Sequence, residues 1–465
     1  MSAPVLWIIL PMLFGGFTLT LGRQRTMAFA GGIASVALAV VALILPIDEA
    51  MRIGPLSIKI ASSASFLGRS LVLPAAEAPL LAVIFGLCAL WFFAADAAGV
   101  ARRLIPFGLI VTSLLVASIA VQPFLFASIL IEIAILVTVP LLCPPGQPPG
   151  RGVMRFLIYE TLGMPFILLA GWLLAGVETS PGDLSLTVQS TVMLGLGFAF
   201  LLAIFPLSIW IPQLMEECDP YPTAFLLWLL PTIVIIFAMG FLDRYAWLRT
   251  SPEVLAGLRG MGLIMLVTGA VWAAFQEHFG RILGYGSIAE IGFLLLALSV
   301  AAGGSDNLVF VLLIPRGFAL AVWSLALSVF RAQGTSLEFT SMEGLGRVYP
   351  WASAGVGLAG LSTAGFPLLA GFPPRLALWE GLGHESPAIM IWFLVGLLGL
   401  MIAAVRQIAA LVRSRDESPW AARETIAQRA ILGAGVFGLV ILGIFPQALG
   451  FLSDQLPLMF LHLSR

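Results

Sequence analysis

Long apolar runs dominate this sequence and constrain its fold more than any other feature. A transmembrane α-helix needs about 20 mostly apolar residues, because lipid offers its backbone no hydrogen-bond partners. Fourteen such runs recur along the chain. They cover 3–20, 27–46, 77–95, 103–121, 123–143, 154–176, 190–211, 223–242, 256–276, 282–302, 308–330, 350–372, 387–412 and 430–452. We therefore expect an all-α integral membrane protein, with about fourteen transmembrane helices in a single membrane domain over residues 1–465.

The composition agrees with residence in lipid. Hydrophobic residues make up 60% of the chain and charged residues only 10%, and the mean hydropathy is +1.06, whereas soluble domains carry about a quarter charged residues. The net charge of −1 excludes the basic field that nucleic acid requires, so no nucleic-acid partner is expected. Cysteines and histidines show no metal-ligand spacing, and no glycine-rich nucleotide loop occurs. We expect no catalytic residue, metal or cofactor in this chain.

The arginines predict an orientation, because short loops on the inner side of a membrane are enriched in Lys and Arg. With the N-terminus outside, thirteen basic residues fall in inner loops and seven in outer loops. Both termini are therefore predicted on the outer side of a bacterial inner membrane.

Prolines and alternating residues indicate where the helices stop. The alternating stretch in 47–76 predicts a strand or hairpin on the outer surface, and the proline-rich 143–152 predicts a rigid connector. Breaks are expected at Pro206, at Pro231 and in GFPLLAGFPP around residue 367. Paired breaks indicate inverted repeats. The expected units are N-terminal helices at 1–101, a first repeat at 102–245, a second repeat at 254–415 and a C-terminal helix at 428–465.

Three motifs carry a family resemblance. They are FPLSIWIPQLMEECDPYPTA at 205–224, RILGYGSIAEIGFLLLAL at 281–298 and LSTAGFPLLAGFPPRLALWEG at 361–381. With Glu132 in the fifth apolar run, they resemble in content and order the antiporter-like membrane subunits of respiratory complex I, the N type above all, which are related to Mrp antiporter subunits. The resemblance implies two inverted five-helix repeats with discontinuous seventh and twelfth helices, and a place beside other membrane subunits and lipid in a multisubunit complex.

The resemblance also implies a charged axis through the membrane, from which this chain departs. Lys59, the only lysine, lies in an outer loop. The seventh-helix lysine position holds Leu201, and the eighth-helix position falls on Pro231 or Thr232. Arg155 and Arg375 stand where the sixth and twelfth helices of the relatives carry lysine, and Glu290 stands at the position of a histidine. The remaining candidates for a proton pathway or for coupling are Glu132, Arg155, Glu160, Glu290, Arg316, Arg375 and Arg406.

Chemistry sets what these replacements can do. A lysine in a dry site can lower its pKa and release a proton, whereas arginine stays charged. We expect Glu132 and Arg155 to form a buried pair, and Arg316 and Arg375 to be structural partners of carboxylates or of carbonyls freed at helix breaks. The acidic residues Glu216, Glu217 and Asp219 are interpreted as a solvated inner turn.

Several functions stay open at this point. The leading hypothesis is a membrane-arm subunit of a complex I-like NADH/quinone oxidoreductase-type assembly, with a degenerate proton channel and a mainly structural or coupling role. Alternatives are a subunit that conducts protons through its glutamates, and a partner in a related carbon-uptake, hydrogenase or cation/proton antiporter assembly. The sequence also leaves open a peripheral redox or hydratase-type module as a partner. A generic secondary transporter is a more distant alternative.

Overall fold

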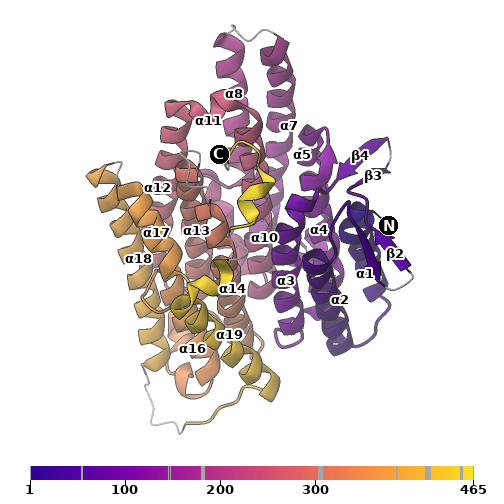
Figure 1. Ribbon diagram of the computed structural model, residues 1–465. Helices are drawn as coiled ribbons and strands as arrows, with labels where there is room; N and C mark the ends of the chain where they lie inside the picture. Colours follow the sequence, from indigo (N-terminus) through magenta and orange to yellow (C-terminus); the bar gives the residue numbers. More distant parts are fainter. Residues whose placement is uncertain are drawn as a thin grey trace.

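The computed structural model describes residues 2–463, except 54–55, 67, 145, 147, 180–183, 302–306, 384–385, 414–419 and 451–453. Helices form most of it (Figure 1). In chain order they are α1 (Leu10–Thr18, preceded by a π-helical turn at Val5–Ile9), α2 (Gln24–Ile44), α3 (Ala78–Ala94), α4 (Ala101–Ala120), α5 (Ala127–Val137), α6 (Val139–Leu142), α7 (Arg151–Thr179), α8 (Leu184–Leu201), α9 (Trp210–Glu217), α10 (Pro220–Arg244), α11 (Ala246–Thr250), α12 (Pro252–Phe275), α13 (Phe279–Ala301), α14 (Asn307–Arg331), α15 (Phe339–Met342), α16 (Pro350–Thr363), α17 (Phe372–Gly383), α18 (Pro387–Val412) and α19 (Ile426–Ile444).

Twelve of the helical segments in the described residues are long and apolar enough to cross a bilayer. Two further apolar segments are shorter: Val5–Thr18, and the pair α16 and α17, which lie on either side of a break. The expected apolar segments are therefore helical. The exact count of fourteen crossings stays a prediction.

The helices divide into central and lipid-facing sets. Over an apolar 18-residue stretch of each helix, 94% of residues are buried in α10 and in α13, against 22% in α8, 28% in α12 and 17% in α19. A helix that is apolar all round and buried all round belongs in the core of a bundle. Accordingly, α10, α13 and α14 run through the middle of the molecule in Figure 1.

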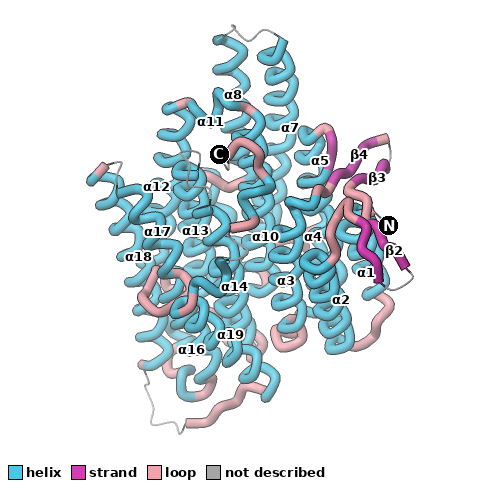
Figure 2. Tube along the Cα trace, in the orientation of Figure 1, coloured by secondary structure: helices cyan, strands magenta, loops and turns pink. Residues whose placement is uncertain are grey.

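Between α2 and α3 the chain forms short strands, which lie at one corner of the bundle. Two antiparallel hairpins form there, β1 (Ala50–Ile53) with β2 (Leu56–Lys59) and β3 (Ser63–Phe66) with β4 (Arg69–Val72). The second hairpin gains β5 (Val121–Gln122) as a third strand. Figure 2 shows them gathered beside the N-terminus. The predicted hairpin is confirmed, and the fold is mostly rather than wholly helical.

Two breaks interrupt the bundle where the sequence predicts them. Helix α8 ends at Leu201, and α9 begins only at Trp210, beyond Pro206. At the second break, α16 ends at Thr363 and α17 begins at Phe372. There the backbone passes so close to Ser362 that a Cβ on Gly371 would meet the Ser362 carbonyl oxygen at 1.8 Å. Only glycine permits that approach.

The break expected at Pro231 does not form. Helix α10 runs unbroken through this proline from Pro220 to Arg244. Proline removes the hydrogen bond to the carbonyl four residues earlier, here that of Leu227. A donor from another helix compensates, as described below.

Helices α7 and α8 are interlocked through two glycines. A Cβ on Gly163 of α7 would lie 2.6 Å from Cγ of Leu201, and a Cβ on Gly197 of α8 would lie 2.6 Å from Cδ1 of Ile167. Each helix therefore offers a hole and, four residues away, a knob that fills the hole of its partner. This fixes their antiparallel register.

Both ends of the chain lie at one end of the bundle. Ala3 N–H donates to the Ala61 carbonyl beside the hairpins. The amides of His462 and Leu463 donate to the Asp243 carboxylate at the end of α10, at 2.6 and 3.0 Å. The N-terminal ends of α4 and α10 meet through Arg103 and Asp219, so the opposite ends, which carry Gln122 and Asp243, share the other side. Which membrane face this is stays a prediction.

Candidate functional site

Two carboxylates from neighbouring helices lie at one end of a charged axis. Glu132 on α5 is 9% exposed and Glu160 on α7 is 1% exposed. Glu132 accepts a hydrogen bond of 2.9 Å from the Thr161 hydroxyl, and its other oxygen has no partner within the described residues. The Oε2 atom of Glu160 is likewise buried without a hydrogen-bond partner in that part of the chain. The two carboxylates are close enough for their charges to interact.

Arg155 does not join this pair, so the expected ion pair between Glu132 and Arg155 is wrong. Its side chain is exposed near the start of α7 and donates a 2.6 Å hydrogen bond to the Gln213 side chain on α9. Helical geometry explains the difference. Arg155 and Glu160 are five residues apart, which places them on different faces of the helix, about 140° apart at 100° per residue.

An apolar wall stands beside Glu160. A cavity of about 10 Å³ adjoins its carboxyl group and is otherwise lined by Leu201, Leu202, Ala203, Trp210, Ile211, Leu226, Leu227, Leu230, Pro231 and Ile291. A void of this size holds about one water molecule. Leu201 is 2% exposed and wedged against Gly163. Leu201, which stands where the resemblance places a lysine, is therefore tightly packed in an apolar surrounding.

Beyond that wall, the guanidinium group of Arg316 lies against α10. Arg316 on α14 is 1% exposed and donates to the carbonyls of Leu227 and Trp228 and to the Thr232 hydroxyl at 3.1 Å. The Leu227 carbonyl is the one that Pro231 leaves without its helical donor. Arg316 thus donates to a carbonyl that a proline has freed, although no helix break forms there. It also brings a guanidinium group to the segment where the resemblance places a lysine.

Glu290 and Arg375 form a buried ion pair next along the axis. Glu290 on α13 is 1% exposed and Arg375 on α17 is 3% exposed, and the guanidinium donates directly to Oε1 of Glu290. The guanidinium also lies 4.6 Å from the centroid of the Phe293 ring, a cation–π distance. The second break places Arg375 at this site, because α17 begins at Phe372, three residues before Arg375. Arg375 therefore neutralises a carboxylate, as the sequence predicts.

Arg406 of α18 lies at the far end of the axis. It donates to the Ala274 carbonyl in the last turn of α12 and lies 5.2 Å from the Phe339 ring centroid. Carbonyls in the last turn of a helix lack helical partners and attract cations. Arg406 therefore caps a helix end.

The acidic segment at the end of α9 is partly exposed to solvent, as expected, but its carboxylates also contact other helices. Asp219 pairs with Arg103 of α4 and lies 3.8 Å from Arg331 of α14. Glu216 pairs with Arg281 of α13 at 2.7 Å, and Glu217 accepts the Gly152 amide at the start of α7 at 2.7 Å. These ion pairs and this hydrogen bond, here called the α9 ionic network, join five helices. The sequence carried a sign of it, because its basic residues are concentrated in the predicted inner loops.

The network also surrounds a cysteine. Burial raises the pKa of the Cys218 thiol to about 12. The thiol therefore stays protonated and unreactive, in line with a packing role.

We expect Asp219→Asn to destabilise the protein modestly, by about 1 kcal/mol, because its two arginine partners remain partly exposed to solvent. Thermal unfolding in mild detergent at low salt measures the effect. Salt near 1 M should shrink the difference by screening the pairs. Glu216→Gln, which removes a pair with one more exposed arginine, is the matched control and should have a smaller effect. A salt-independent loss in Asp219→Asn would contradict an ionic origin.

Relatives of known annotation match most of the chain. A region of 335 residues is 29% identical to NADH-quinone oxidoreductase subunit N of Rhodococcus opacus (strain B4) and covers 67% of this chain and 60% of that protein. Subunit N of Dehalococcoides mccartyi (strain ATCC BAA-2100 / JCM 16839 / KCTC 5957 / BAV1) is 28% identical over 317 residues, 63% of each chain. The matched region therefore spans less than two thirds of these relatives.

Solved structures share the fold over the whole chain. A chain of the Mrp complex from Dietzia sp. DQ12-45-1b superposes with a TM-score of 0.84 at 17% identity, over 99% of this chain and 97% of that one. A chain of respiratory complex I from Thermus thermophilus with bound NADH gives a TM-score of 0.78 at 19% identity, over 99% of this chain and 100% of that one. At such identities the likeness shows the fold alone.

The family follows from a model described as NADH:quinone oxidoreductase/Mrp antiporter, TM, which matches residues 154–402. That region is more than half of the chain, and it contains both helix breaks and all the axis residues named above except Glu132 and Arg406. The chain belongs to the NADH:quinone oxidoreductase/Mrp antiporter transmembrane family.

Proposed function

We propose that this chain is a membrane-arm subunit of a complex I-type energy-coupling assembly, and that its proton channel is degenerate. Its role is then mainly architectural or coupling. Other membrane subunits pack beside it, and the exergonic chemistry takes place elsewhere in the complex. The family and the relatives named subunit N support the class of assembly.

One observation carries the degenerate channel. The carboxylates Glu132 and Glu160 are separated from the group of Arg316, Glu290 and Arg375 by an apolar wall that includes Leu201 and Leu230. No hydrogen bond joins the two groups among the residues that the structure describes. Beyond the wall, each cation is an arginine, which stays charged at ambient pH. A stepwise relay needs groups that titrate, so the arrangement favours fixed charges.

The repeat organisation forms part of the proposal. We assign residues 102–245 and 254–415 to two inverted repeats, since each range contains one of the two helix breaks. Arg316 and the α10 carbonyls then join the second repeat to the first. We place the chain in a bacterial inner membrane with both termini outside.

The experiment measures proton yield in sealed vesicles containing the whole complex. Glu160→Gln should leave the protons moved per redox turnover unchanged, because Glu160 has no route across the wall. Glu160 suits this test because it forms no ion pair with any residue that the structure describes, so its loss strands no described cation. Glu49→Gln, in an exposed loop, is the control for a conservative exchange. A reduced yield in Glu160→Gln alone, with assembly and redox turnover intact, would overturn the degenerate channel.

A second candidate is a proton-conducting subunit of a related carbon-uptake, hydrogenase or cation/proton antiporter assembly. The observation that favours it is that Glu132 and Glu160 each keep a carboxylate oxygen without a partner in the described structure. One of these carboxylates adjoins the cavity for a single water. Mass spectrometry of the subunits that co-purify in mild detergent separates the assemblies, and the vesicle assay separates conduction from coupling.

A further inference from the structure

Beyond α19 the chain continues along the side of the bundle as irregular backbone. This C-terminal segment, residues 445–450 and 454–463, contains two short 3₁₀ turns, Pro446–Leu449 and Leu456–Met459. Its inward side packs on α14, where the rings of Phe460 and Phe310 stack at 6.4 Å. Figure 1 shows it in yellow, running past α14 toward the end of α10. The segment is thus fixed to the core of the bundle on one side.

The start of the C-terminal segment lies at membrane depth. Pro446 borders a cavity of about 50 Å³ together with Ile314 and Pro315 of α14. Pro315 is the ninth residue of α14, so it lies about 12 Å along the helix axis from the first residue, at 1.5 Å per residue. Helix α14 is a candidate membrane span over Leu308–Arg331. Pro446 therefore lies inside the hydrocarbon region rather than at its edge.

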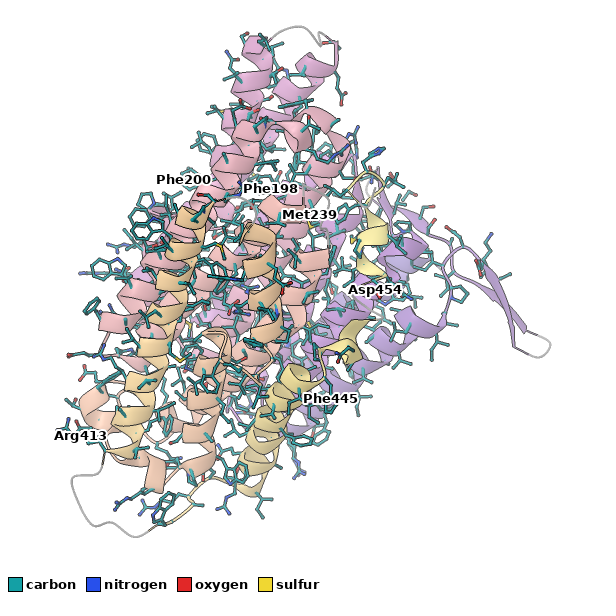
Figure 3. The ribbon with its side chains drawn as sticks, turned by 60° about the vertical axis from the view of Figure 1, so that its left-hand side comes forward. Phe198, Phe200, Met239, Arg413, Phe445 and Asp454 are labelled. Carbon is teal, nitrogen blue, oxygen red and sulfur yellow. The ribbon has the colours of Figure 1, made fainter. Side chains whose placement is uncertain are left out.

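The outward side of the C-terminal segment is poorly suited to lipid. Phe445, labelled in Figure 3, is 58% exposed, and the amide side chain of Gln447 is exposed close to it. Irregular backbone and polar side chains at this depth occur where protein or water covers them, because lipid offers no hydrogen bonds. The exposed apolar side chains of Phe445 and Leu458 (62%) argue against water. We therefore expect another protein on this side.

The same face of α14 is open farther along the helix. Phe310 and Ile314 line the small cavity beside the C-terminal segment, whereas Phe318, Ala321 and Leu325 line a groove of about 370 Å³. These five positions follow one another every three or four residues, so they form one stripe along the helix. The sides of the groove come from α3 and α19. A straight helix laid along this stripe would fill the groove and cover the outward side of the C-terminal segment.

Charge at one end of this face indicates what the partner carries there. The Asp454 carboxylate is exposed, and Glu77, just before α3, has a carboxylate oxygen without a hydrogen-bond partner in the described structure. The turns Ala75–Glu77 and Leu456–Met459 pack against each other. Neither carboxylate forms an ion pair with a residue that the structure describes. A lysine or arginine at this end of the partner would complement both charges.

We propose that the face formed by α3, α14, α19 and the C-terminal segment docks one transmembrane helix of another membrane subunit, with a lysine or arginine beside Asp454. This docking site rests on the proposed place of the chain in a multisubunit assembly and adds a surface to it. In Figure 1, α18 and α5, which carry the two ends of the charged axis, lie on opposite sides of this face. The partner therefore docks beside the axis rather than at either end of it.

The test uses the whole complex, isolated in mild detergent, with a photoreactive phenylalanine analogue at Phe93 in the groove or at Leu458 on the C-terminal segment. Both positions should crosslink to the same membrane-spanning peptide of one other subunit. That peptide should contain a lysine or arginine at the end nearest Leu458.

Two variants test the polar contacts through the crosslink from Leu458. Gln447→Leu and Asp454→Lys should each lower the yield about tenfold, because one removes an interhelical hydrogen bond and the other places like charges together. Gln189→Leu is the matched control, because Gln189 is also an exposed glutamine but lies on α8. It should leave the yield unchanged.

Crosslinks to lipid alone, to a second copy of this chain or to two different subunits would overturn the docking site. So would an unchanged yield in both Gln447→Leu and Asp454→Lys. If other membrane subunits co-purify in such a case, only the docking site fails and the proposed function stands. Purification of the chain with no other membrane subunit would overturn both.

Discussion

Glu290→Gln should destabilise the protein by about 3–5 kcal/mol, because it removes one partner of a buried ion pair. The substitution leaves the guanidiniums of Arg375 and Arg316 near each other with no carboxylate between them. Adding Arg375→Met should recover most of the loss, since a buried pair replaced by neutral groups of similar volume is often tolerated. Thermal unfolding of the purified protein in detergent, as a double-mutant cycle, measures both effects.

The control for this cycle is Glu277→Gln, which neutralises an exposed carboxylate just before α13. Its effect should stay within about 0.5 kcal/mol. A double variant as unstable as Glu290→Gln alone would show that the pair is not what holds α13 and α17 together at this point.

Arg316→Met should cost about 3 kcal/mol, and the loss should depend on a proline in another helix. Three acceptors lose a charged donor, and the Leu227 carbonyl is left with no partner. A buried unsatisfied carbonyl alone costs about 1–3 kcal/mol. Pro231→Ala supplies the missing backbone N–H to Leu227. The Arg316→Met/Pro231→Ala variant should therefore be more stable than Arg316→Met, as measured by thermal unfolding.

Pro106→Ala provides the matched control for this rescue. Pro106 is a buried proline inside α4, so its replacement restores a backbone donor at another site. It should not improve Arg316→Met beyond its effect in wild type. Equal rescue by both alanine variants would refute a specific link between Arg316 and the carbonyl freed by Pro231.

The sequence predicted the helices well because lipid imposes a simple rule on them. Every spanning segment must be apolar and about 20 residues long, so the runs are visible without knowing any contact. The sequence also predicted the breaks around Pro206 and residue 367, because proline or closely spaced glycines interrupt an apolar run there. The family that the motifs at 205–224, 281–298 and 361–381 indicated was confirmed, since the family match covers residues 154–402.

The pairings across helices were harder, because they depend on helix rotation. Pro231 resembles Pro206 in the sequence, yet only Pro206 lies at a break. Helix α10 continues through Pro231, as α4, α7 and α14 continue through Pro106, Pro165 and Pro315. The partner of the carbonyl that Pro231 frees is Arg316, more than 80 residues away. The expected contact of Glu132 with Arg155 failed for a similar reason, since Arg155 faces away from the buried side of α7.

The α9 ionic network could not be predicted from its own segment. Three acidic residues near a predicted loop are typical of a solvated turn, and only the packing of α4, α13 and α14 brings Arg103, Arg281 and Arg331 to them. By contrast, Arg316 and Arg375 met expectation, because a buried guanidinium must have partners wherever it lies.

The interlock of α7 with α8 limits how this part of the protein can move. Gly163 holds Leu201 and Gly197 holds Ile167, so sliding one helix by a single residue would drive a side chain into backbone. We therefore expect the two helices to move together as one rigid body. Leu201 is also the last residue of α8, so any hinge between this rigid body and α9 lies at residues 202–209, next to Glu160 and its cavity. A neighbouring subunit that displaced α7 and α8 would therefore change the shape of the apolar wall beside Glu160.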